Sequence, residues 1–152
     1  MTPRDVVDAI AVKLAQLWPE RMIYRDFCPV DFQRPSCFLW IPKSDLHPSN
    51  AHLVRWSMEA ELELFCATDA YDIQSTEELA RDQEKVLCVF DGTPLAVLDR
   101  HLLVTATAEG MEVGSAYVRF TAAWMDAWPS RTQSDTIPLM EQFSIKMTNE
   151  RG

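Results

Sequence analysis

The alternation of apolar and polar residues along the segment from Leu53 to Cys66 constrains the fold more than any other feature of this chain. A period of two is typical of a β-strand with one face on a core and the other on water or a partner. A strand of this length requires several neighbours, so the sequence predicts a protein dominated by a sheet. The polar face of this strand carries carboxylates at alternate positions: Glu59, Glu61 and Glu63.

Other periodic segments complete the pattern of one α+β domain. Amphipathic helices are predicted over residues 3–18, capped by Thr2, and over residues 76–90, capped by Ser75. The expected fold is a mostly antiparallel sheet with these two helices packed side by side on one face. Strands are predicted over residues 22–24, 37–41, 53–66, 95–98, 101–109 and 112–124.

The connections are predicted from turn-forming and polar residues. Gly110 and Met111 are expected to form the turn between the last two strands, and residues 42–50 are expected to be a loop because they contain two prolines. Residues 128–135 are predicted to be a polar linker. The chain therefore divides into an α+β domain, residues 1–127, and a linker with a C-terminal strand, residues 128–152.

That C-terminal strand is predicted from the alternation of Phe143, Ile145 and Met147 with polar residues. Two interpretations remain open: it adds to the sheet edge or surface of a neighbouring subunit, or it folds back on its own sheet. If it is exchanged, deleting residues 136–152 is expected to leave a folded monomer that no longer assembles.

The aromatic residues suggest core positions and subunit contacts. Five of them are interpreted as core residues because they fall on strand positions expected to face the helices; these are Phe38, Trp40, Trp56, Phe120 and Trp124. Trp18 and Trp128 lie at element ends and are therefore candidates for a subunit contact. The apolar side of the C-terminal strand, Phe143, Ile145 and Met147, is the other candidate contact.

Composition excludes several classes of protein. A hydrophobic content of 47% indicates a folded chain, and a net charge of −9 argues against binding to nucleic acid or to an anionic membrane surface. No apolar run is long enough to span a bilayer, and the opening residues are expected to form a helix of the mature protein rather than a signal peptide. The four widely spaced cysteines favour buried free thiols over disulfides, and with them a reducing cytoplasm.

No catalytic pattern stands out in the sequence. His47, His52 and His101 lack partners at metal-ligand spacing, and the chain has neither a glycine-rich phosphate loop nor a G-x-S-x-G elbow. Neighbouring carboxylates of the Glu59–Glu63 row are spaced almost as in an inverting glycosidase, but a solvated acidic strand face is a commoner cause of such a row. The sequence therefore predicts a protein that is not an enzyme, with no catalytic or metal residues and no cofactor.

The chain resembles the tail terminator, or tail completion, proteins of tailed phages, prophages and phage-tail-like particles. The resemblance covers residues 4–147 and departs from the family at the proline-bearing segment 42–50. It is carried by the opening helix, M-I-Y at 22–24, F-Q-R-P-S-C-F-L-W-I at 32–41, the alternating strand at 53–66, the helix before Asp91-Gly92, the hairpin at 101–124 and the tail from Met140-Glu141.

This resemblance implies a tail-terminator-like fold and a structural role in the virion or particle, which assembles in the bacterial host cytoplasm. Such proteins form a ring, commonly of six subunits, at the head-proximal end of the tail tube. The ring ends tube growth, meets the last sheath ring if the tail is contractile, and joins the head or neck connector. The alternative is a non-enzymatic cytoplasmic adaptor that caps another protein as a monomer or dimer.

In a ring, the acidic strand face is a candidate for the wall of the channel. A tail conduit must let DNA through without holding it, and carboxylates repel phosphate. The hypothesis is that this face lines the lumen; the alternative is a solvated exterior, with Arg55 and Arg119 pairing with the glutamates across strands or subunits. The candidate lumen or interface residues are Glu59, Glu61, Glu63, Thr105, Thr107, Glu109 and Arg119.

Overall fold

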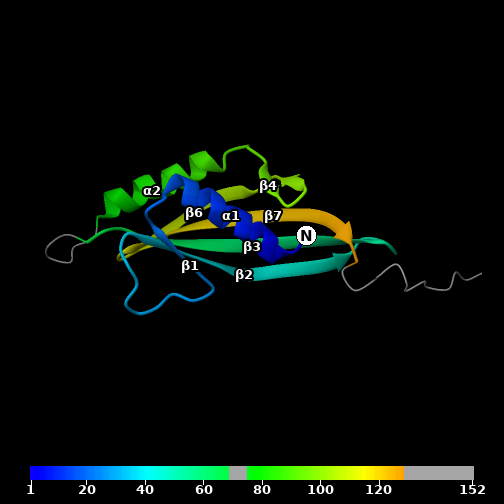
Figure 1. Cartoon of the computed structure of the whole chain (residues 1–152), viewed down its shortest axis with the longest axis horizontal. Helices are drawn as coiled ribbons and strands as arrows, with labels where there is room; N and C mark the ends of the chain where they lie inside the picture. Colours follow the sequence, from blue (N-terminus) through cyan, green and yellow to red (C-terminus); the bar gives the residue numbers. More distant parts are fainter. Residues whose placement is uncertain (69–74, 129–152) are drawn as a thin grey trace, which may run out of the picture.

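The computed structural model describes residues 1–68 and 75–128 (Figure 1). Helices α1 (Pro3–Leu17) and α2 (Thr76–Val89) accompany a five-stranded sheet and a separate two-stranded hairpin. The strands of the sheet are β1 (Met22–Arg25), β2 (Ser36–Pro48), β3 (Leu53–Phe65), β6 (Thr105–Glu112) and β7 (Ser115–Ala127); those of the hairpin are β4 (Leu95–Val97) and β5 (Arg100–Leu102). The predicted α+β class is confirmed.

The strand order in the sheet is β1-β2-β3-β7-β6, and only the β1–β2 pair is parallel. The alternating segment of the sequence is the central strand, β3, which pairs with β7 from Leu53↔Ala127 to Phe65↔Ser115. The prediction of a mostly antiparallel sheet is therefore confirmed.

Helix α1 begins at a capping box. The Thr2 hydroxyl accepts a hydrogen bond from the Asp5 N–H at 3.4 Å, while the Asp5 carboxylate accepts one from the Thr2 N–H at 2.7 Å. Pro3 occupies the first turn, where its missing N–H costs nothing. The apolar stripe of the helix is fully buried against the sheet and consists of Val6, Val7, Ile10 and Leu14.

Helix α2 is held partly by buried polar side chains. Ser75 caps it by accepting a hydrogen bond from the Glu78 N–H at 3.3 Å. Gln83 Nε2 donates to the backbone oxygens of Glu109 and Tyr117, at 3.0 and 2.8 Å, which joins the helix to β6 and β7. Asp82, 2% exposed, forms an ion pair with Arg21 at 2.8 Å and joins α2 to the segment after α1.

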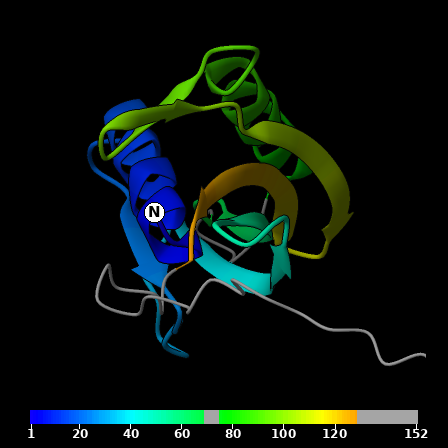
Figure 2. The ribbon, with the colours of Figure 1, turned by 90° about the vertical axis from the view of Figure 1, so that its right-hand side faces the viewer.

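Both helices lie on one face of the sheet, as predicted. Figure 2 shows α1 and α2 on one side of the curled sheet and the β1–β2 connection on the other. The even-numbered residues of β3 face the helices, and Ala60, Leu62 and Leu64 are 0% exposed. The opposite face of the sheet, called the outer face below, carries the odd-numbered residues of β3.

Three predicted boundaries are wrong. Residues 42–48 continue β2 instead of forming a loop, because β1 pairs with β2 only as far as Leu39 and prolines are tolerated beyond it on an edge. The β6–β7 turn lies at Val113-Gly114, where Gly114 takes the positive φ of 83°, and Gly110 lies in a register shift. The predicted strand 101–109 is divided, since its first residues pair with β4.

Candidate assembly face

Strand β3 positions a row of carboxylates on the outer face. Glu59, Glu61 and Glu63 alternate with buried residues of the helix-facing side, and each is partly buried by neighbouring strands. On β7, Thr121 lies beside Glu59 and Arg119 lies beside Glu61. On β6, Thr105 lies beside Thr121 and Thr107 lies beside Arg119. The candidate residues predicted from the sequence therefore share one face, although they are drawn from three strands.

Arg119 lies at the centre of this row and pairs with several carboxylates. Its Nη1 is 3.7 Å from Glu59 Oε2, its Nη2 is 4.0 Å from Glu61 Oε2, and its Nε is 2.9 Å from Glu109 Oε1. The Nε–H is not directed at the Glu109 oxygen, so this contact is an ion pair without a hydrogen bond. Arg119 neutralises part of the row within the subunit, and the row keeps a net negative charge.

The surroundings of Glu61 raise the pKa of its carboxyl group. Its side chain is 16% exposed, and burial together with the nearby Glu109 carboxyl raises its pKa, while Arg119 acts in the opposite direction. The charge at this point of the face therefore depends on pH above the ordinary range of a glutamate.

Glu63 belongs to a second polar cluster near the β6–β7 turn. The Ser115 hydroxyl donates to Glu63 Oε1 at 2.7 Å, and the Tyr117 hydroxyl lies 3.2 Å from Glu63 Oε1 and 3.3 Å from Glu112 Oε2. Burial and the charges of the two glutamates raise the pKa of Tyr117 to about 12. Tyr117 therefore stays protonated throughout the physiological pH range, and its single hydroxyl hydrogen is shared between the two carboxylates.

An aromatic pair adjoins the carboxylates and corrects a prediction. Phe38 and Trp40 were expected in the core, but the register places them beside Glu63 and Glu61 on the outer face, where both are half-buried. Their rings stack with centroids 4.6 Å apart. The outer face therefore combines aromatic surface with charge, a composition typical of the centre and rim of protein interfaces.

The connection between β1 and β2 covers one end of the outer face. The Phe32 ring packs on Phe65 with centroids 4.2 Å apart, and the Arg34 guanidinium lies 4.8 Å from the Phe32 ring centroid. Arg34 also donates to the Cys66 carbonyl oxygen at 3.3 Å. The same connection exposes Phe27 and Val30, at 74% and 102%. It thus provides apolar contact surface next to the charged row.

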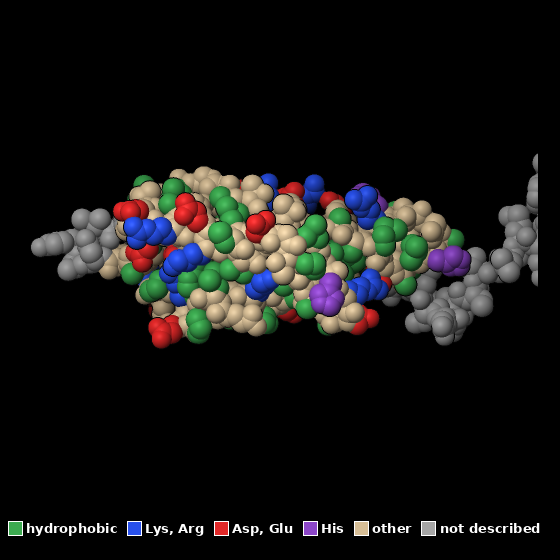
Figure 3. Space-filling view, turned by 90° about the horizontal axis from the view of Figure 1, so that it is seen from above, with side chains coloured by type: hydrophobic (Ala, Val, Ile, Leu, Met, Phe, Trp, Pro, Cys, Tyr) green, Lys and Arg blue, Asp and Glu red, His purple; other side chains and the backbone are tan. Residues whose placement is uncertain are grey.

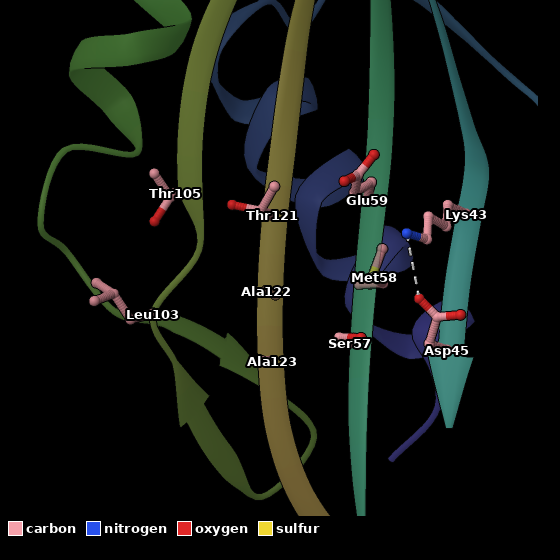
Figure 4. Close-up of a pocket in the computed structure, with 10 residues that line it drawn as sticks. All are labelled: Lys43, Asp45, Ser57, Met58, Glu59, Leu103, Thr105, Thr121, Ala122 and Ala123. Atoms are coloured by element: carbon pink, nitrogen blue, oxygen red, sulfur yellow. Dashed lines mark ion pairs between the residues drawn. The ribbon is translucent and has the colours of Figure 1, made fainter. Parts of the chain in front are cut away.

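The middle of the outer face forms an open groove of about 340 Å³. Figure 4 shows Thr105, Thr121 and Glu59 on three adjacent strands, and Lys43 paired with Asp45. The Lys43 Nζ lies 3.7 Å from Asp45 Oδ2. The groove is lined by hydroxyls, paired charges and apolar side chains that include Met58 and Leu103, and it is open rather than enclosed. Such a surface suits contact with another protein better than enclosure of a small ligand.

The four cysteines are free thiols; Cys37 and Cys66 are buried, whereas Cys88 is exposed, contrary to the expectation that it is buried. Burial raises the pKa of Cys37 to about 12, which keeps that thiol protonated. Among residues 1–68 and 75–128, no group of three His, Cys, Asp or Glu side chains is arranged to hold a metal ion.

The aromatic subunit-contact candidates have different positions. Trp18 is 9% exposed and packs in the core beneath the Arg21 guanidinium, which lies 4.2 Å from its ring centroid. Packing within its own chain therefore explains Trp18, and little of its surface remains for a partner. Trp128 is half-buried, and its Nε1–H donates to the Asn50 carbonyl at 3.3 Å. Phe143, Ile145 and Met147 lie outside the described residues.

The opposite side of the molecule has a different charge pattern. Figure 3, seen from the side of α2 and the β4–β5 hairpin, shows positive and negative side chains interspersed without a single-sign patch. No helix among the described residues is long and apolar enough to cross a membrane.

Comparison of the sequence with protein-family models and with curated proteins finds no match.

Proposed function

We propose that this chain is a structural subunit of a phage or phage-like tail. It forms a ring, of six subunits, that caps the head-proximal end of the tail tube, ends tube and sheath growth, and provides the joining surface. The observation that carries the proposal is the asymmetry of the sheet: helices cover one face, while the outer face remains open and combines ion pairs with aromatic surface. A sheet of this kind is completed by neighbours rather than by a small ligand.

In the proposed ring, the outer face lines the lumen in whole or in part. Carboxylates outnumber cations on it: the carboxylates are Asp45, Glu59, Glu61, Glu63, Glu109 and Glu112, and the cations are Lys43, Arg55 and Arg119. Net negative charge repels DNA phosphates, and the pairing of Arg119 with glutamates leaves it less able to hold a phosphate. DNA would therefore pass without being retained.

The partners follow from this position. The ring contacts other copies of itself, the tail tube protein, the sheath protein if the tail is contractile, and the head or neck connector. It binds neither a specific nucleic acid sequence nor a membrane. The protein is assembled in the bacterial host cytoplasm and remains in the virion or tail-like particle. It is not an enzyme and uses no cofactor.

Tail length tests this proposal. Cells that produce the particle are compared with cells in which this gene is deleted, and tube lengths are measured by electron microscopy. The proposal predicts longer tubes of irregular length without the gene and normal tubes after complementation. Tubes of unchanged length in the deletion strain would contradict a terminating role.

The alternative is a non-enzymatic adaptor that binds one partner protein. Exposure of Phe27 and Val30 on a single connection favours it, because exposed apolar side chains suit a small one-to-one contact. Native mass spectrometry separates the two proposals: an adaptor remains a monomer or dimer, whereas the tail protein forms a closed ring.

A further inference from the structure

Strand β6 ends the five-stranded sheet. Its sole neighbour among the described strands is β7, so one side of Thr105–Glu112 has no strand beside it. The outward N–H and C=O groups of such an edge form a ready template for another strand. Proteins that leave an edge open often fill it by strand addition from a partner.

An apolar groove of about 370 Å³ accompanies this edge on its helix-facing side. It lies between the end of α2 and the start of β6, and its lining includes Leu87, Cys88, Phe90, Val104 and Ala106. Ala106 and Ala108 are the β6 residues that pair with buried Phe120 and Val118, so they share the helix-facing side. Their small side chains leave room for larger apolar side chains on an adjacent strand.

We propose that residues 141–148 of a neighbouring subunit add to the β6 edge as a sixth strand. This segment alternates Phe143, Ile145 and Met147 with polar residues, and a period of two matches a strand with one buried face. The three apolar side chains enter the groove beside α2. Gln142, Ser144 and Lys146 then project from the outer face.

Charge complementarity supports this orientation. On the outer side of the sheet, Lys146 enters the neighbourhood of Glu109 and the other carboxylates, where the net charge is negative. The reverse orientation would place Lys146 on the helix-facing side, where apolar side chains make up most of the groove lining and Asp91 is its one carboxylate.

The exit of the chain favours a neighbour over the subunit's own edge. Trp128 is joined to Asn50 at the β2–β3 turn, and β3 and β7 separate that turn from β6 in the strand order. The chain therefore leaves the domain on the side away from its own β6 edge. Residues 129–140 could span at most about 40 Å, so the segment that follows them is not confined to the edge of its own subunit.

The inference rests on the proposed ring, and cross-linking tests it separately from assembly. The full-length Ile145→Cys variant is treated with a short bismaleimide, because exposed Cys88 lines the groove. We expect covalent dimers and higher species that contain a peptide linking position 145 to Cys88. These species should disappear when Cys88→Ser is added. The Ser144→Cys variant, on the polar side of the same segment, is the matched control and should not form this link.

Native mass spectrometry of the same samples reports the ring independently. A ring without the link between position 145 and Cys88 overturns the strand inference and leaves the proposed function intact. A link found within one chain overturns exchange between subunits, and equal linking by Ser144→Cys overturns the assignment of faces. A monomer without the link overturns both proposals. A charge at the buried position, Ile145→Asp, should abolish the ring, whereas Ser144→Asp should preserve it.

Discussion

Alternate residues of the same strands form two faces of the sheet, and the two faces differ in burial and in charge. On the helix-facing side, Leu62 and Leu64 are fully buried, and their contacts are completed within the chain. On the outer side, Glu61 and Glu63 are partly exposed and paired laterally with residues of β7. Packing within the chain therefore completes the contacts of one face, while side chains of the other face stay partly exposed.

A charge placed on the helix-facing side of the sheet should destabilise the protein most. Leu62→Asp should unfold the protein, because an unpaired buried charge costs several kcal/mol against a total stability of about 5–15 kcal/mol. Ser57→Asp puts the same charge on the outer side of β3 and is the matched control. Circular dichroism during urea unfolding measures both variants. Equal destabilisation by the two substitutions would contradict the assignment of faces.

A smaller effect is expected at the ion pair beneath α2. Asp82→Ala leaves Arg21 without its partner in a largely buried site, so we expect a loss of about 3–5 kcal/mol. The control is Glu77→Ala, which breaks the exposed pair with Arg81 on the same helix and should cost about 0.5 kcal/mol or less. Chemical denaturation compares them. A loss at Asp82 no greater than that at Glu77 would show that the buried pair does not hold α2 on the sheet.

Loss of Arg119 tests the lateral pairing of the outer face. Arg119→Gln removes the cation between Glu59, Glu61 and Glu109, and we expect a loss of about 1 kcal/mol from repulsion among the remaining carboxylates. Added salt should reduce that loss, since it screens exposed charges. Thermal unfolding at low and high salt measures the difference. A loss that does not change with salt would point to packing rather than charge.

Replacing Glu61 should change the free energy of unfolding least of all, and by an amount that depends on pH. Because the folded-state pKa of Glu61 is raised above its ordinary value of 4.5, its contribution to stability is present below that value and is lost as pH rises through the folded pKa. Glu61→Gln should therefore be more stable than the parent at neutral pH, by about 0.5 kcal/mol, and lose this advantage in acid. Glu84→Gln, on the exposed side of α2, is the control. If Glu61→Gln remained more stable than the parent in acid, the raised pKa of Glu61 would not be the cause.

Local patterns predicted much of the fold. The capped helix α1 and the central strand β3 follow from sequence periodicity, because in both elements the buried side chains recur at the period of the backbone. The extension of β2 through Pro48 was missed because prolines indicate a loop unless the strand is known to be an edge. Whether a strand lies at an edge depends on which strands pair with it, and a local sequence pattern does not determine that pairing.

The candidate face was predicted less completely. Alternation alone identified Glu59, Glu61 and Glu63, but Phe38 and Trp40 were assigned to the core because the run from Cys37 to Ile41 is apolar at every position. Only the register with β3 shows which alternate set faces outward. The role of Asp82 was also missed, since its partner Arg21 lies on a distant segment of the chain.

The position of Glu59, Glu61 and Glu63 in the assembled ring decides whether the outer face lines a lumen. Cryo-electron microscopy of the particle, or of the purified ring, gives the distance of these carboxylates from the central axis. We expect these carboxylates to lie on the inner wall and to point toward the axis. Carboxylates on the outer wall, pointing away from the axis, would contradict it.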